Sequence, residues 1–203
     1  MSSHYYLEPT AVTVKCPHSN LEELAAPLNV QIIHCWNNRL TSIPEYRRLE
    51  ELLCGNTGRS HETRPGYMWG NHIPKLPNFR KLGKLYCGNV GLNELPNCQY
   101  MEDLDCSDNN LTEIPPYSWL KRLFCGNIVG GSNRIPELIM YPLLETLDCP
   151  NAGIEVMPLY PNLKVINLTG NPIAESMDDP TSIVEYRRMA TPRAKSARSA
   201  KRY

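Results

Sequence analysis

Residues 101–115 read MEDLDCSDNNLTEIP, and this pattern repeats along most of the chain. Its apolar residues occupy positions one, four, six, eleven and fourteen, with an asparagine at position nine and a proline at the end. Cysteines mark the sixth position of neighbouring copies: Cys16, Cys35 and Cys54 are 19 residues apart, and so are Cys87, Cys106 and Cys125. A fixed short period of this kind predicts a solenoid.

Eight copies fit between residues 11 and 175. In each, positions three to six alternate between outward and inward side chains, which is the period of a strand. We therefore expect about eight short parallel strands stacked into one curved sheet. A period of 19 residues leaves little room for helices opposite the sheet, so extended or 3₁₀ backbone is expected there, supported by the closing prolines.

Four further segments surround or interrupt the repeats. Residues 1–10 are expected to form a lead-in that caps the first copy. The spacing from Cys54 to Cys87 is 33 residues, which predicts a loop insertion at 57–73. Residues 176–190 are expected to form a short capping helix that starts near Asp179 and covers the last copy with Ile183, Val184 and Met189. Residues 191–203 are expected to be a disordered basic tail.

Charge and cysteine usage bear on the compartment. The chain has 21 Lys and Arg and 21 Asp and Glu, but seven of the basic residues and none of the acidic ones follow Tyr186. An acidic body thus carries a basic tail. No apolar run could cross a bilayer and no secretory signal is evident, so we expect no membrane association and an intracellular, monomeric protein. Its eight cysteines are then expected to stay reduced.

The cysteines do not predict chemistry. Seven of the eight occupy the same inward position, which favours a buried column. Cys98 departs from the period and is expected to be the most exposed thiol. No C-x₂-C pair supports a zinc site, and no glycine-rich loop precedes a helix to hold phosphate. We therefore expect no metal, no cofactor and no catalysis.

The outward positions of the strands are the candidate binding face for a partner protein. Leu53, Tyr86 and Phe124, with His34 and Trp36, are expected to form an exposed aromatic and apolar stripe. Packing of these residues on one another, or on a flanking loop, is the alternative. Asp103, Asp105 and Asp148 are expected to be solvated on the same face. The full set is His34, Trp36, Leu53, Lys84, Tyr86, Asp103, Asp105, Arg122, Phe124 and Asp148.

The basic tail offers a second candidate function. Its Lys and Arg side chains could neutralise phosphates of a nucleic acid or another anionic surface. A solvated tail without a partner and a nuclear import signal are the other interpretations. The residues concerned are Arg193, Lys195, Arg198, Lys201 and Arg202.

The pattern LxxLxCxxNxLxxIP resembles the leucine-rich repeat superfamily over about residues 11–173. Its short period is most similar to repeats of bacterial effectors and of leucine-rich repeat proteins from large DNA viruses. The resemblance implies a right-handed solenoid that binds a protein on its concave sheet, in the host cytoplasm if the protein is viral. In this family the asparagine bonds neighbouring backbone. Position nine is matched by Asn38, Asn109 and Asn171, whereas four asparagines fall one residue early: Asn56, Asn89, Asn127 and Asn151.

Overall fold

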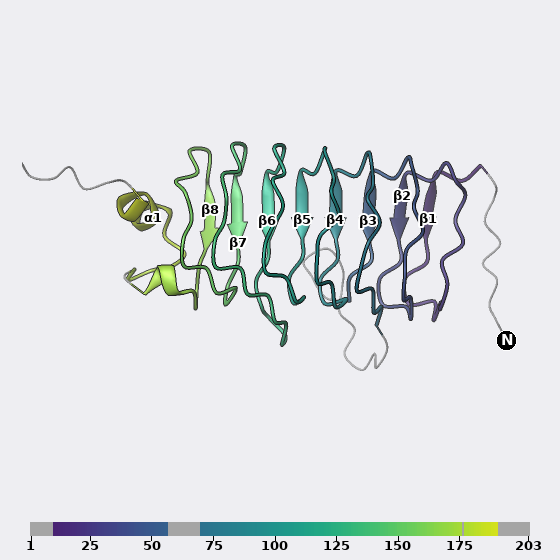
Figure 1. The fold of residues 1–203 in the computed structure, drawn as a ribbon, viewed down its shortest axis with the longest axis horizontal. Coiled ribbons are helices and arrows are strands. Elements are labelled where there is room, and N and C mark those ends of the chain that lie inside the picture. Colours follow the sequence, from purple (N-terminus) through teal and green to yellow (C-terminus); the bar gives the residue numbers. More distant parts are fainter. Residues whose placement is uncertain (1–9, 57–69, 176, 191–203) are drawn as a thin grey trace, which may run out of the picture.

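The structure is a computed structural model that describes residues 10–56, 70–175 and 177–190. It is a solenoid whose eight parallel strands form one sheet in sequence order, as Figure 1 shows. The predicted fold class is confirmed. The strands are β1 Thr13–Lys15, β2 Ile32–His34, β3 Glu51–Leu53, β4 Lys84–Tyr86, β5 Asp103–Asp105, β6 Arg122–Phe124, β7 Thr146–Asp148 and β8 Val165–Asn167.

All eight strands pair in the same register, so equivalent positions of the repeat form columns along the solenoid. Leu85 of β4 pairs with Leu104 of β5, for example, and Leu104 with Leu123 of β6. This middle position is buried in every strand, because one strand cannot cover its own inner face. Each fully buried aliphatic side chain contributes roughly 1.5–3 kcal/mol relative to an exposed one.

The cysteine column is buried as predicted, but it is not wholly reduced. All seven cysteines at position six are buried. The structure joins Cys125 and Cys149 in a disulfide, with an S–S distance of 2.16 Å. Because stacking brings equivalent positions side by side, their Cα atoms lie 4.7 Å apart. The expectation that all eight cysteines are reduced is therefore wrong for this pair.

A second buried column lies in the turns that lead into β3 to β8. Its members stand three residues before position one of the next copy: Tyr46, Phe79, Cys98, Tyr117, Tyr141 and Tyr160. Tyrosine hydroxyls of this column donate to carbonyls of the preceding turn, as Tyr117 does to Pro96 O at 2.6 Å. Cys98 belongs to this column, so the prediction of an exposed thiol is wrong. Burial raises the pKa of the Cys98 thiol to about 11.

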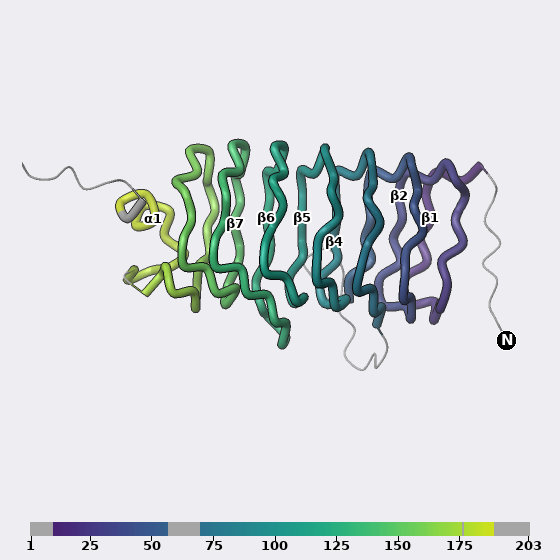
Figure 2. The backbone as a smooth tube through the Cα atoms, in the orientation of Figure 1, coloured from purple at the N-terminus to yellow at the C-terminus, as the bar shows by residue number. Residues whose placement is uncertain are grey.

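The C-terminal end is covered by a short 3₁₀ helix, Pro172–Ala174, and by α1, Ile183–Ala190, which follows β8 in Figure 1 and lies at the end of the solenoid beyond β7 in Figure 2. Tyr186 is the residue that covers the last turn. It is fully buried, and its hydroxyl donates to Pro158 O at 2.8 Å. Ile183 packs against the core, but Val184 is 72% exposed, so its predicted covering role is wrong.

The start of α1 also differs from the prediction. Asp179 accepts hydrogen bonds from the amide and hydroxyl of Thr181 and forms a turn ahead of the helix. The side chain that caps α1 is Ser182, whose hydroxyl accepts from the amide of Glu185 at 3.3 Å. In the described part of the chain, no helix is long and apolar enough to cross a membrane.

Candidate interaction face

The candidate site is the outward face of the sheet, made of the side chains at positions three and five of each repeat; we call it the sheet face. An asparagine ladder at the end of the strands keeps these side chains in register. Asn109 Nδ2 donates to Cys87 O at 2.9 Å and to Cys106 O at 3.0 Å. Its Oδ1 accepts from the amides of Val90 and Leu92. One side chain thus joins two turns of the solenoid.

The ladder reaches the position-six carbonyl of every turn, although only some repeats carry its asparagine. Each ladder residue reaches the position-six carbonyls of two consecutive turns, so five asparagines serve all eight turns. They are Asn38, Asn71, Asn109, Asn133 and Asn171. Sequence reasoning missed Asn71 and Asn133, because inserted residues separate each of them from its cysteine.

The asparagines that fall one residue early have their own roles. Asn89 and Asn151 adopt the left-handed conformation, with φ of 56° and 55°, which asparagine tolerates better than most residues. Asn56 and Asn127 instead close the insertions: Asn56 Nδ2 donates to Asn71 O, and Asn127 Nδ2 donates to Asn133 O. The sequence Cys-Gly-Asn does not distinguish these two roles, because it stands at residues 87–89 as well as at both insertions.

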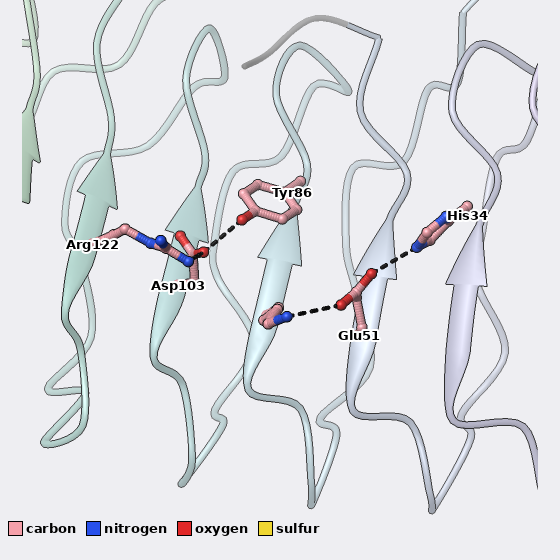
Figure 3. Close-up of polar contacts among 6 residues, drawn as sticks. His34, Glu51, Tyr86, Asp103 and Arg122 are labelled. Atoms are coloured by element: carbon pink, nitrogen blue, oxygen red, sulfur yellow. Dashed lines mark hydrogen bonds and ion pairs between the residues drawn. The ribbon is translucent and has the colours of Figure 1, made fainter. Parts of the chain in front are cut away.

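Two polar clusters lie on the sheet face (Figure 3). The first, which we call the Glu51 cluster, spans β2, β3 and β4. His34 Nε2 donates to Glu51 Oε1 at 2.7 Å, and Lys84 Nζ donates to Glu51 Oε2 at 3.2 Å. Burial acts to raise the pKa of Glu51, but these bonds and the nearby charges outweigh it and hold the pKa below its usual value.

The second, the Asp103 cluster, spans β4, β5 and β6 and has the same layout. Tyr86 OH donates to Asp103 Oδ2 at 2.5 Å, and Arg122 donates to the same oxygen. Burial and the adjacent carboxylate raise the pKa of Tyr86 above its usual value, because both disfavour the phenolate. Asp103 Oδ1 is buried without a hydrogen-bond partner.

Sequence reasoning found five of the six residues in these clusters and missed Glu51. A signal was available in the sequence. Position three of the repeat, which is the first residue of each strand, is Glu51 in β3, Lys84 in β4, Asp103 in β5 and Arg122 in β6, so acid and base alternate from strand to strand. Opposite charges in neighbouring strands attract one another.

The predicted acids are on the sheet face but are not solvated. Asp103, Asp105 and Asp148 are only 2%, 1% and 7% exposed. Asp105 accepts from the amide of Ser107 at 3.1 Å, and Asp148 accepts from Asn167 Nδ2 at 3.1 Å. Neighbouring strands are close enough for longer side chains to cover a short aspartate, which is why the prediction of solvated acids is wrong.

The predicted exposed stripe is also wrong in part. Leu53 is buried at 6% exposure, whereas His34, Trp36, Tyr86 and Phe124 are half-buried. The rings of His34 and Trp36 lie 5.5 Å apart, so packing of these residues on one another accounts for part of their burial. The cations are the exposed members of the predicted set: the side chains of Lys84 and Arg122 are 52% and 53% exposed.

Other predicted features fall outside the described residues. They are residues 1–9 of the lead-in predicted at 1–10, residues 57–69 of the insertion predicted at 57–73 and the tail residues Arg193, Lys195, Arg198, Lys201 and Arg202. Within the described residues, no group of three or more His, Cys, Asp or Glu side chains could hold a metal ion.

The fold and its repeated face define a solenoid repeat protein of the parallel-β type. Comparison of the chain with protein-family models, with curated proteins and with solved structures finds no match.

Proposed function

We propose that the protein is a non-enzymatic scaffold that binds a partner protein on the sheet face. The observation that carries this proposal is the continuity of that face: eight strands in one register present their side chains as a single surface. Hydrogen bonds between turns hold those side chains in place before any partner arrives, which lowers the entropy cost of binding.

The half-buried rings supply the anchors. Tyr86 and Phe124 are at position five of β4 and β6, next to the exposed cations of the same strands. Aromatic and arginine side chains are the usual hot spots of protein interfaces. The resemblance to leucine-rich repeats supports the same proposal, because that family binds proteins on the concave sheet.

Site-specific photo-crosslinking tests the proposal. A benzophenone amino acid replaces Phe124 on the sheet face or, in a matched control, Met140, which is 50% exposed and lies outside the strands. The modified proteins are irradiated in an extract of the source cells, and adducts are identified by mass spectrometry. We expect benzophenone in place of Phe124 to give a discrete adduct, and benzophenone in place of Met140 to give no adduct of that mass.

A second variant tests whether formation of the adduct depends on the aromatic anchors. Phe124→Glu places a charge among the anchors and should abolish the adduct formed by a benzophenone at Tyr86. Thermal unfolding checks that the variant is folded. An adduct of the same partner in equal yield from Met140 and Phe124 contradicts the proposal.

A further inference from the structure

The sheet face presents the opposite charge to the one its composition suggests. Its position-three and position-five columns contain the acids Glu51, Asp103, Asp105 and Asp148. Three of these are buried and Glu51 is half-buried, whereas the charged side chains of the described strands that are exposed are Lys15, Lys84 and Arg122. A partner that lies on this face therefore meets cations first.

Lys84 and Arg122 are held in place yet keep donors available. Each is anchored from one side by a carboxylate of the preceding strand, Glu51 or Asp103. An ammonium group has three N–H donors and a guanidinium has five, so one such anchor leaves others directed to solvent. With half of each side chain exposed, both can take a second anionic partner.

The register fixes the spacing of these two cations. They occupy position three of β4 and β6, on either side of Asp103 in β5. Parallel strands are about 4.8 Å apart, so the two positions are about 10 Å apart. A peptide in the polyproline II conformation advances about 3.1 Å per residue with three residues per turn, so side chains three residues apart lie on the same side of it, about 9 Å apart.

We propose that the sheet face binds an acidic segment of a partner protein, which lies in the polyproline II conformation across β4, β5 and β6. Two carboxylates three residues apart meet Lys84 and Arg122, and a side chain between them contacts Tyr86 and Phe124. This inference rests on the proposed function and specifies the chemistry of the partner.

The edge of the face argues against a nucleic acid as the occupant. Glu50 and Glu102 are exposed just before the strands, and Glu102 pairs with Lys121 at 2.8 Å. A duplex or a single strand carries closely spaced charges along its length and would meet these acids. Two discrete carboxylates avoid them.

Three fluorescent peptides of one otherwise neutral sequence test the inference. They carry glutamate, glutamine or lysine at two sites three residues apart, and binding to the full chain is measured by anisotropy. We expect the glutamate peptide to bind about tenfold more tightly than the glutamine peptide, since each exposed ion pair accounts for up to about fivefold. Added salt should reduce this difference.

Protein variants locate the site. Lys84→Gln should weaken binding of the glutamate peptide about two- to fivefold. Lys75→Gln is the matched control, because Lys75 is 74% exposed and pairs with Glu94 outside the strands, and it should have no effect. The double variant Asp103→Asn with Arg122→Gln removes a cation without leaving a buried carboxylate unpaired, and it should weaken binding to the same degree.

Asp103→Asn alone gives the sharpest result. It removes the negative charge that competes with the peptide for Arg122, while the asparagine oxygen can still accept from Tyr86 and Arg122 and hold them in place. Binding of the glutamate peptide should therefore be retained or strengthened. Tighter binding of the lysine peptide, loss of binding in Asp103→Asn, or displacement of the glutamate peptide by an oligonucleotide at lower concentration would each overturn the inference. A crosslinked partner that requires Phe124 but is indifferent to Lys84 and Arg122 leaves the proposed function standing and removes this inference.

Discussion

The Glu51 and Asp103 clusters have the same layout and differ in burial. Each places a carboxylate at position three, a ring donor from the preceding strand and a cation from the following one. The Glu51 side chain is 22% exposed, whereas that of Asp103 is 3% exposed. Glutamate extends beyond its neighbours into solvent, and the shorter aspartate lies beneath them. A difference of one methylene group in the acidic side chain therefore distinguishes a partly exposed ion pair from an ion pair whose carboxylate is buried.

The largest expected effect on stability comes from removing Arg122, the counter-ion of Asp103. Arg122→Gln leaves a buried carboxylate that already has one oxygen without a hydrogen-bond partner. We expect the free energy of unfolding to fall by about 2 kcal/mol, the usual cost of losing a charged hydrogen bond at a buried site. Urea denaturation followed by circular dichroism measures it.

The double variant with Asp103→Asn is the control for that experiment. Removing both charges should restore most of the lost stability, because no unpaired charge is then buried. A double variant as unstable as Arg122→Gln would show that the arginine acts through packing and not through its charge.

Loss of the Tyr86 hydroxyl is expected to cost less. Tyr86→Phe keeps the ring and removes one of the two hydrogen bonds to Asp103 Oδ2, which should lower the free energy of unfolding by about 1 kcal/mol. Ultraviolet titration gives an independent readout. In Asp103→Asn the pKa of Tyr86 should fall toward its usual value, because the carboxylate that disfavours the phenolate is gone. An unchanged titration would contradict the assigned cause.

These two clusters show what could be predicted from the sequence. The period and the strand pattern are local features, so the sheet, its register and its facing residues could be predicted from spacing alone. Burial on the sheet face could not, because it depends on the lengths of side chains in the strands on either side. Asp103 and Glu51 occupy the same column and have different exposure for that reason.

The same distinction explains the errors elsewhere. Cys98 departs from the column that the cysteines mark, but it belongs to a column of larger side chains with a different offset. Asn71 and Asn133 perform the function of a repeat position at an irregular spacing, since insertions move them along the chain without moving them in space. Fixed spacing identifies columns only where no residues are inserted.

The ion pair of Lys84 with Glu51 should contribute much less to stability than the ion pair of Arg122 with Asp103. Lys84→Gln leaves Glu51 with His34 and with access to water, so the expected loss is about 0.5 kcal/mol or less. High salt should remove most of it, because exposed ion pairs are screened. The measurement is the same urea titration at low and high ionic strength. A loss equal to that of Arg122→Gln would contradict the claim that burial distinguishes the clusters.

The smallest expected effect is the pH dependence that comes from Glu51. Its pKa is lower in the folded protein than its usual value of 4.5, so the carboxylate stabilises the fold above that pH. The contribution is lost as the pH falls through the lowered pKa, and its size should stay below about 0.5 kcal/mol because the site is partly exposed. Comparing the free energy of unfolding of the wild type and Glu51→Gln from pH 7 to pH 3 measures it. The two curves should converge in acid, Lys84→Gln should reduce their separation at neutral pH, and Lys75→Gln should not. Curves that stay parallel down to pH 3 would show that the cluster does not lower the pKa of Glu51.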